Sequence, residues 1–472
     1  MSLRTKQPHV LVISYPAQGH VNPLLQFCKR LAAKGIKITF ATTKSFSKTV
    51  HIDNNTLISF ETFSDGFDNN TPGQFVPPDV HFPKLHEVGS KSLSDLVTKL
   101  DGLNAIIYDG FLHWALDVAK RFGIVGAAFF TQTCAVNSIY YHVNRNILKT
   151  PLSNSVVSLP GLPKLENWET PSFVHKCDVF PVVRDVVFSQ FTDIDRADWV
   201  FFNSFYKLEE EHKKILASRS IEVKTYNLES KKVVDWMMKL WRVRTIGPTL
   251  PSMYLDKQLL DDEDYMINLL KPKSIECMNW LKNKPKRSVV YLSFGSLIQP
   301  GPEQMEEITS SLTDGEFSFL WAMKSSEEAK VPKEFLNGES KKGLVVTWCS
   351  QLEVLAHESI GCFVTHCGFN SILEAIGLGV PIVAIPQWSD QTTNAKYVED
   401  VWCVGVRAKP DANGIVNRRA LDECIREVME GEKGNVIKNN VIKWRDSAKE
   451  AIGEGGSSDK NIDEFVAELK LQ

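Results

Sequence analysis

Short apolar runs rich in β-branched residues alternate with stretches of helical periodicity along most of this 472-residue chain. HVLVISY at 9–15 has the pattern of a buried strand, and a helix-like spacing of apolar residues follows it as far as Gly35. IKITFATT then provides a second strand at 36–43. Two strands joined by a helix form a βαβ unit, which builds a parallel sheet. The sequence therefore predicts an α/β fold.

The alternation is interrupted once, near 241–265, where prolines, a glycine and a run of acidic residues indicate a linker between domains. It resumes at SVVYLSFGS (288–296) and continues through further short strands, GLVVTW and GCFVTH among them. Two doubly wound halves in series account for this pattern, and the chain is long enough for two domains of ordinary size. Such folds bind ligands outside the carboxyl ends of their strands, so we expect a cleft where the halves face each other.

Composition and charge exclude several classes of function. A formal net charge of -3 provides no basic field, so the sequence does not indicate a nucleic-acid partner. The apolar runs are far shorter than a membrane span, and the first lacks the length and cleavage pattern of a signal peptide. Nine cysteines are scattered without a CxxC pair, which favours free thiols in a reducing compartment. We therefore expect a cytoplasmic protein.

Three potential metal ligands, Cys362, His366 and Cys367, lie close together in the sequence. A structural zinc site takes four ligands, usually as two closely spaced pairs, and the sequence offers no matching second pair. We therefore expect no metal at this position.

The stretch THCGFNSILEA lies between an apolar strand and a helix. The N-terminus of a helix has unsatisfied N–H groups and a partial positive charge, which together bind phosphate. Gly368 would let the backbone approach an anion, and Asn370 and Ser371 would add donors in the first turn. His366 would add a donor at the strand end, while Glu374 would accept hydrogen bonds from a ribose diol. The pattern fits a nucleotide diphosphate; a helix capped by its own Asn or Ser is the alternative.

Other nucleotide-binding fingerprints are absent from the sequence. No GxGxxG follows the first strand, and no GxxxxGK followed by Ser or Thr occurs anywhere. GLGVP, at 377–381, leads into a strand rather than a helix, which is typical of a turn. The sequence therefore argues against hydride transfer on a dinucleotide and against phosphoryl transfer at a P-loop.

A potential acid–base pair occurs in the first half of the chain. His20 lies in the loop after the first strand, just before Asn22 and Pro23, a favourable helix start. Asp109 ends the strand NAIIYD. Both follow strands that we expect to be parallel, so they can share one crevice, where a neutral histidine oriented by an aspartate would deprotonate a hydroxyl. The alternative is structural, with His20 at a helix terminus and Asp109 as a cap.

From Trp348 to Gln391 the chain reads WCSQLEVLAHESIGCFVTHCGFNSILEAIGLGVPIVAIPQWSDQ. This stretch resembles, almost residue for residue, the donor-binding box of the plant family 1 UDP-dependent glycosyltransferases. The similarity extends along nearly the whole chain and includes YPAQGHVNP near the start, VVYLSFGS in the second half and EGGSSDKNIDEFVAEL at the end. The flanking sequence is most similar to the subgroup that glucosylates salicylate-type acids, steroids or triterpenes.

The resemblance implies two facing Rossmann-like domains with a cleft between them, the GT-B architecture. The corresponding parts are an acceptor-binding domain at 1–250, a linker at 251–270, a UDP-sugar-binding domain at 271–456 and a final helix at 457–472 that returns to the first domain. The stretch GEGGSSDK before that helix resembles a phosphate loop but follows no strand. We expect it to be a hinge between helices, with Ser457 or Ser458 as the cap.

The resemblance also assigns the donor site residue by residue. Positions implied at the base and ribose are Trp348, which stacks on uracil, Cys349, whose backbone pairs with uracil, and the ribose ligands Gln351 and Glu374. Positions implied at the diphosphate are Ser296, His366, Asn370 and Ser371. Positions implied at the sugar are Trp388, Asp390 and Gln391. Glutamine at the last of these usually accompanies UDP-glucose, where histidine tends to accompany UDP-galactose.

His20 matches the general base of the family and Asp109 its charge-balancing partner. The implied reaction is an inverting transfer of glucose from UDP-glucose to a hydroxyl or carboxyl of a small hydrophobic acceptor, which gives a β-glucoside. No cofactor or metal is implied, because backbone and side-chain donors stabilise the departing UDP. An inactive UDP-sugar or small-molecule sensor on the same fold is the alternative. A nucleotide-sugar epimerase or a phosphorylase would need a cofactor lysine site or two sugar-recognition sites, which the sequence lacks.

The chain departs from the family pattern at three places. Phe369 replaces a common tryptophan and is expected to pack behind the diphosphate site, and Ile372 replaces a common threonine. The highly charged stretch 207–232 is longer than in relatives, and we expect it to form a surface loop rather than to alter the entrance to the acceptor pocket.

Phenols, sterols, triterpenes and aromatic acids all fit this sequence as acceptors. We expect a monomer, with UDP-glucose and one such acceptor as its partners. Aromatic candidates for the lining of the acceptor pocket are Phe67, His81, Phe82, Trp114, Phe130 and Tyr140.

Overall fold

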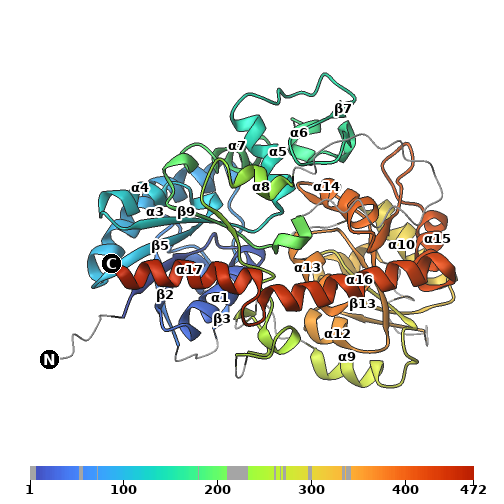
Figure 1. Cartoon of the computed structure of the whole chain (residues 1–472). Helices are drawn as coiled ribbons and strands as arrows, with labels where there is room; N and C mark the ends of the chain where they lie inside the picture. Colours follow the sequence, from blue (N-terminus) through green and yellow to red (C-terminus); the bar gives the residue numbers. More distant parts are fainter. Residues whose placement is uncertain are drawn as a thin grey trace.

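A computed structural model describes residues 7–52, 57–71, 73–178, 180–209, 232–259, 262–265, 267–268, 273–295, 300–331, 335 and 342–472. Figure 1 shows two α/β lobes side by side, one built from the first half of the chain and the other from the second. The long helices α16 (Gly431–Ile452) and α17 (Ser457–Leu471) run one after the other along the same side of the two lobes (Figure 1).

Seven parallel strands form the sheet of the first lobe, in the order β10-β9-β6-β5-β1-β2-β4. These strands are β1 (His9–Ile13), β2 (Lys37–Thr43), β4 (Ile58–Phe63), β5 (Leu103–Asp109), β6 (Val125–Phe130), β9 (Trp199–Phe202) and β10 (Val243–Thr245). The main helices are α1 (Gln18–Ala33), α3 (Pro78–Lys99), α4 (Ala115–Arg121), α5 (Cys134–Asn144) and α7 (Pro181–Ser189). The strands predicted at 9–15, 36–43 and 104–109 are confirmed as β1, β2 and β5.

Six parallel strands form the sheet of the second lobe, in the order β14-β13-β12-β15-β16-β17. These strands are β12 (Val289–Ser293), β13 (Ser318–Ala322), β14 (Gly343–Val346), β15 (Ile360–Thr365), β16 (Ile382–Ala384) and β17 (Gly405–Arg407). The main helices are α9 (Ser274–Leu281), α10 (Pro302–Asp314), α12 (Gln351–Ala356), α13 (Phe369–Leu378), α14 (Gln391–Lys396) and α15 (Arg418–Met429). The predicted α/β fold with two parallel sheets is confirmed.

Smaller elements connect and extend the two lobes. They are α2 (Lys44–Ser47), α6 (Ser172–His175), α8 (Val233–Met237) and the antiparallel pairs of β3 (His51–Ile52) with β11 (Ile267–Asn268) and of β7 (Val156–Val157) with β8 (Leu165–Glu166).

Each sheet is buried on both faces, as helices on either side of a parallel sheet require. In β1, Leu11 and Ile13 belong to one apolar cluster, while Val10 and Val12 point to the opposite face and belong to another. Successive residues of β12 divide between two clusters in the same way. This burial explains why the strands appear in the sequence as continuous apolar runs rather than as an alternation of apolar and polar residues.

Helix α17 lies along the first lobe although it is the last element of the chain. Phe465 packs edge-on against Trp199 of β9, with ring centroids 5.3 Å apart. Arg242 and Arg244, beside and within β10, pair with Glu464 at 3.1 and 2.7 Å. Helix α17 therefore packs against β9 and β10, the last two strands at one edge of the first sheet.

The prediction that Ser457 or Ser458 caps α17 is wrong. The N-cap is Gly456, and no side chain caps the helix there. A Cβ at Gly456 would lie 2.1 Å from the Glu450 carbonyl oxygen, so the turn after α16 is too tight for a serine at that position. Ser458 Oγ instead donates to the Gly247 carbonyl at 2.7 Å, which ties the start of α17 to the segment that leaves the first lobe.

The charged stretch 207–232 lies almost entirely outside the described residues. Its described ends are the last residues of a short 3₁₀ turn, Tyr206–Glu209, and Lys232 just before α8. No helix within the described ranges combines the length and the apolar character needed to cross a membrane.

Candidate active site

His20 and Asp109 meet at the carboxyl edge of the first sheet. His20 lies in the first turn of α1, and Asp109 is the last residue of β5, the parallel neighbour of β1. His20 Nδ1 lies 2.7 Å from Asp109 Oδ2, and the other carboxylate oxygen accepts the Phe111 N–H at 2.9 Å. The Asp109 side chain is 2% exposed and that of His20 is 17% exposed. Asp109 is therefore buried, while part of the His20 ring remains accessible to solvent.

This geometry selects one tautomer of His20. An ionised carboxylate only accepts hydrogen bonds, so the proton of a neutral ring sits on Nδ1 when Nδ1 faces Asp109 Oδ2. Nε2 is then unprotonated and can accept a proton from a hydroxyl. Asp109 also caps the 3₁₀ turn Gly110–Leu112 that follows it. The carboxylate therefore has both roles that the sequence allowed: it caps this turn and it orients His20.

Aromatic rings surround His20. Its ring centroid lies 4.7 Å from Phe111 and 5.3 Å from Tyr15, and Tyr15 stacks on Phe82 at 5.5 Å. His81 contacts both Tyr15 and Phe67, at 6.1 and 5.8 Å. Of the predicted acceptor-pocket residues, Phe67, His81 and Phe82 therefore lie in one aromatic cluster with the histidine.

The other predicted lining residues are buried and contact other rings. Trp114 stacks on His86, Phe130 stacks between Phe191 and Phe202, and Tyr140 is fully buried. The sequence did not lead us to predict Tyr15 or Phe111 at the site. Both residues lie shortly after strands that end at the same edge of the sheet, and this position could have indicated them.

His366 lies in the second lobe at the point where β15 ends and α13 begins. Loop backbone encloses its ring closely, since a Cβ at Gly368 would lie 2.5 Å from Nε2 and a Cβ at Gly295 would lie 2.8 Å from Cε1. Gly368 is the N-cap of α13 and has no side chain to satisfy the helix end. The first N–H groups of α13 therefore lack a side-chain cap, the condition under which a helix terminus receives an external anion.

His366 acts as a neutral donor or acceptor rather than as a charge. Burial lowers the pKa of His366 to about 4. The imidazole is therefore uncharged at neutral pH, and its Nδ1 lies 3.2 Å from Thr365 Oγ1. Phe369 and Ile372, the two departures from the family pattern on α13, are both buried in the core behind this turn.

Glu374 and Gln351 form a polar network on α12 and α13. Gln351 Nε2 donates to one carboxylate oxygen of Glu374 and also reaches Ser371 Oγ at 3.3 Å. The hydroxyl of Tyr265 donates to the other carboxylate oxygen at 2.8 Å. Burial raises the pKa of Glu374, and these two hydrogen bonds oppose that rise. The predicted ribose ligands are thus brought together, with Tyr265 as a partner that the sequence did not indicate.

Asn370 joins the two lobes at the site. Its Nδ2 donates to the carbonyl of Gly19, the residue before His20, at 2.6 Å. Asn203, which directly follows β9, lies 3.5 Å from Asn370 Oδ1. The first turn of α13 therefore contacts the first turn of α1, and the predicted diphosphate residue Asn370 lies beside the turn that bears the predicted base.

The predicted sugar residues form a sharp loop before α14. Gln391 Oε1 accepts the N–H groups of Gln387 and Trp388 at 2.9 and 3.1 Å, so this side chain shapes the loop. Ser389, with φ of 59°, donates its N–H to Ser172 Oγ in the first lobe at 2.6 Å, and its carbonyl accepts the Ser172 N–H at 2.8 Å. Asp390 is 7% exposed and accepts a hydrogen bond from Asn394 at 2.6 Å.

The predicted uracil residues lie at the far end of this site. Trp348 accepts the Lys273 N–H through its carbonyl at 3.0 Å, and the Cys349 thiol lies 3.4 Å from the Tyr291 hydroxyl. Tyr291 also donates to Gln351 Oε1 at 3.2 Å, which links this end to the ribose residues. Ser296, predicted at the diphosphate, lies outside the described residues.

Comparison with known proteins identifies the family. Residues 198–448 match the family described as UDP-glucoronosyl and UDP-glucosyl transferase, and residues 7–59 match a glycosyltransferase N-terminal domain. Mogroside I-E synthase of Siraitia grosvenorii is 42% identical over 469 residues, which cover 98% of each chain. A flavonol 7-O-beta-glucosyltransferase of Arabidopsis thaliana is 42% identical and covers 98% of this chain and 99% of its own.

Solved structures agree with this relationship. Os79 from O. sativa, in complex with UDP, superposes with a TM-score of 0.86 at 36% identity and covers 98% of this chain and 100% of its own. Another structure of Os79 contains a trichothecene and has a TM-score of 0.84. The predicted GT-B architecture and enzyme class are confirmed, and this chain belongs to the UDP-glycosyltransferase family.

Proposed function

We propose that this enzyme transfers glucose from UDP-glucose to a hydroxyl or carboxyl of a small hydrophobic acceptor, with inversion at the anomeric carbon. Glycosyl transfer follows from the family; the donor, the acceptor class and the residue roles are the proposal. The observation that carries it is the 2.6 Å contact of Asn370 with Gly19, because it sets the uncapped N-terminus of α13 beside the turn that bears His20.

The proposed mechanism is a single displacement between the two lobes. His20 Nε2 takes the proton of the acceptor hydroxyl as its oxygen bonds to the anomeric carbon of glucose. The bond from that carbon to the diphosphate breaks at the same time, and UDP leaves with the electron pair. Asp109 stabilises the imidazolium that forms, and the helix terminus with Asn370, Ser371 and His366 stabilises the charge on the diphosphate. An α-linked donor then gives a β-glucoside.

The surroundings of His20 support a hydrophobic acceptor. The rings of Tyr15, Phe82 and Phe111 pack around the histidine and offer aromatic faces to a flat or apolar molecule. A flavonol glucosyltransferase among the relatives and a trichothecene in a related structure are consistent with acceptors of this kind.

A mass-spectrometric screen tests this function. The protein is incubated with UDP-glucose, and separately with UDP-galactose, against a panel of flavonoids, sterols, triterpenes and benzoates. We expect an acceptor to gain the mass of one hexose with UDP-glucose, and the gain to be lost in His20→Ala. Saturable UDP binding without product from any acceptor would instead favour the sensor.

The carboxylate of Asp390 predicts a pH dependence for sugar recognition. Burial raises the pKa of Asp390 to about 6. The group is ionised above that pH and can accept two sugar hydroxyls, whereas below it the protonated group loses part of this capacity. The affinity of the wild-type protein for UDP-glucose, relative to that of Asp390→Asn, should therefore fall as the pH falls through about 6. Calorimetric titration of both proteins with UDP-glucose on either side of this value measures the ratio.

Comparing two proteins with the same ligand cancels pH effects that act on the diphosphate itself. In Asp390→Asn the affinity for UDP-glucose should be low and should not show this step. An equal pH dependence in both proteins would assign the effect to another group.

A further inference from the structure

Tyr265 joins the two lobes at the proposed ribose site. Its ring packs against the apolar cluster that α1 shares with the first sheet. Its hydroxyl donates to Glu374 Oε1 in the second lobe at 2.8 Å. The residue belongs to the crossing segment, residues 246–259 and 262–265, which lead from β10 toward the second lobe. A single side chain therefore links the acceptor-side core to a donor-side carboxylate.

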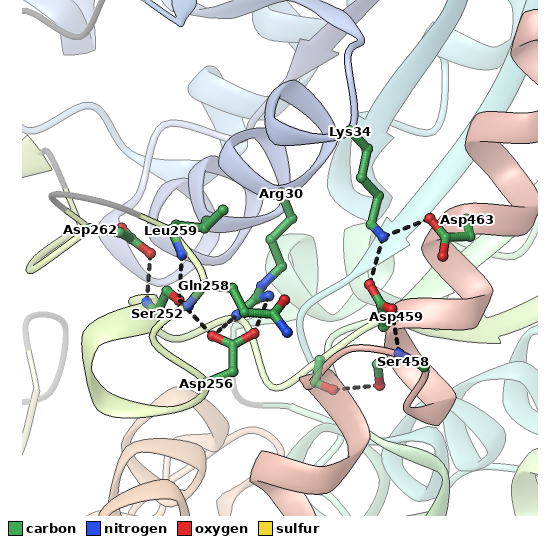
Figure 2. Close-up of polar contacts among 12 residues, drawn as sticks. Arg30, Lys34, Ser252, Asp256, Gln258, Leu259, Asp262, Ser458, Asp459 and Asp463 are labelled. Carbon is green, nitrogen blue, oxygen red and sulfur yellow. Dashed lines mark hydrogen bonds and ion pairs between the residues drawn. The ribbon is translucent and has the colours of Figure 1, made fainter.

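Buried ion pairs hold the crossing segment on α1. Lys29 Nζ lies 2.6 Å from Asp262 Oδ1 and 2.7 Å from the Asp264 carbonyl, and both charged side chains are largely buried. Gln26 Nε2 donates to the same carbonyl at 2.9 Å. Asp262 Oδ2 accepts the Ser252 N–H at 2.6 Å, a contact visible in Figure 2. The carbonyl of Asp264, the residue next to Tyr265, is thus held by two donors from α1, and Asp262 is held by Lys29 and by the Ser252 N–H.

A second set of contacts holds the other end of this segment on the same helix. Arg30 pairs with Asp256 at 2.9 and 3.2 Å through two nitrogens, and Asp256 also accepts the Ser252 hydroxyl. Figure 2 shows Arg30 and Lys34 reaching from α1 to Asp256 and to Asp459, respectively. Helix α1, which carries His20 in its first turn, is therefore the support on which Tyr265 is placed.

The Glu374 carboxylate is held by one donor on each oxygen. Tyr265 occupies one acceptor position of Oε1, and Gln351 occupies one of Oε2. Each oxygen of a carboxylate has two acceptor positions, so one remains free on each for a further donor. A vicinal diol presents two hydroxyl donors side by side, and it can bind to the two oxygens together only if the plane of the carboxylate is fixed.

We propose that Tyr265 is a positioning residue for the donor nucleotide, whose hydroxyl fixes the Glu374 carboxylate for recognition of the ribose diol. The inference rests on the proposed function, since it takes the diol to be that of UDP. It goes beyond that function by assigning a role in donor binding to a side chain of the crossing segment, outside the stretch from Trp348 to Gln391 in the second lobe.

Calorimetric titration with UDP and with 2′,3′-dideoxy-UDP tests the role of Tyr265. In Tyr265→Phe we expect the affinity for UDP to fall about fivefold or more, while the affinity for the dideoxy nucleotide changes much less. The preference for the ribose diol should therefore shrink. In steady-state kinetics the KM for the UDP-sugar should rise with little change in kcat, because the hydroxyl is remote from the reacting atoms.

Two further variants make the result specific. Tyr254→Phe removes a tyrosine hydroxyl from the same crossing segment, at the 3₁₀ turn Ser252–Tyr254, and this hydroxyl bonds to no described residue. It should preserve the preference for UDP over the dideoxy nucleotide. In Glu374→Gln the preference should already be low, and adding Tyr265→Phe should not lower it further, because both changes act on the same contact.

Three outcomes would overturn the inference. Unchanged UDP binding in Tyr265→Phe would mean that the hydroxyl does not support ribose recognition, and tighter binding would mean that it occupies the ribose position. An equal loss for both nucleotides would show a general structural effect. Wild-type protein that binds neither nucleotide would overturn the proposed function itself, a result that the titration separates from the other two.

Discussion

Replacement of His20 by alanine should lower kcat for a hydroxyl acceptor about 100- to 10,000-fold, the range that a positioned general base contributes. The expected loss follows from the contact of Nδ1 with the buried carboxylate of Asp109, which leaves Nε2 free to take a proton. The affinity for UDP should stay nearly constant, because His20 belongs to the first lobe and the predicted nucleotide residues belong to the second. Initial rates at saturating donor, with UDP binding measured separately, give both quantities.

Acceptor chemistry supplies an internal control for this experiment. A carboxylic acid is already ionised at neutral pH, so its transfer should suffer much less from His20→Ala than transfer to a phenol. Asp109→Asn should lower the rate with the phenol in the same direction, because the ring would lose the charge that stabilises its protonated form. Equal losses with both acceptors would contradict a role for His20 in proton removal.

Substitution of Gly368 by alanine should weaken UDP binding about tenfold, the usual consequence of overpacking a closely packed position. The added Cβ would lie 2.5 Å from Nε2 of His366, so the ring must move away from the start of α13. Displacement of the ring removes a neutral donor from the proposed diphosphate site and disturbs the uncapped helix terminus. Calorimetry with UDP measures the change directly.

Gly301 provides a matched control for Gly368. It is also the N-cap of a helix, α10, with φ of -64° against -60° at Gly368, and a Cβ there would meet nothing within 4 Å. Gly301→Ala should therefore leave UDP affinity unchanged. If Gly368→Ala also left it unchanged, the start of α13 would not be the diphosphate site.

The fold could be predicted because its signals are local. Strands buried on both faces appear as continuous apolar runs, and β1, β2 and β5 lie where those runs predict them. The pairing of His20 with Asp109 was also accessible, since parallel strands that alternate with helices bring their carboxyl ends to one edge. The assignment of the donor residues depended on the resemblance to a family rather than on the chemistry of the residues alone.

Contacts that depend on the placement of one lobe against the other could not be predicted. The contact of Asn370 with Gly19 spans 351 positions of the sequence and requires the closed arrangement of both lobes. Tyr265 gave no signal because it follows a run of acids that is typical of an exposed linker, whereas Asp262 of that run is buried and pairs with Lys29. The cap of α17 was misassigned because a tight interhelical turn favoured Gly456 over a serine with better capping propensity.

Residue type alone did not separate the predicted pocket residues that lie beside His20 from those that do not. Phe82 belongs to the aromatic cluster around His20, whereas Trp114 and Phe130 are buried against other rings. Tyr15 and Phe111 lie beside His20 because each follows a strand end, a property of the sheet edge rather than of residue type.

The configuration of the product at the anomeric carbon tests the central claim most directly. A single displacement, with His20 on one side of the sugar and the helix terminus of α13 holding the diphosphate on the other, converts an α-linked donor into a β-linked product. Proton NMR of the purified glucoside distinguishes the two configurations through the coupling of the anomeric proton. A β-glucoside is the predicted result; an α-glucoside would contradict the mechanism that the contact between the two lobes supports.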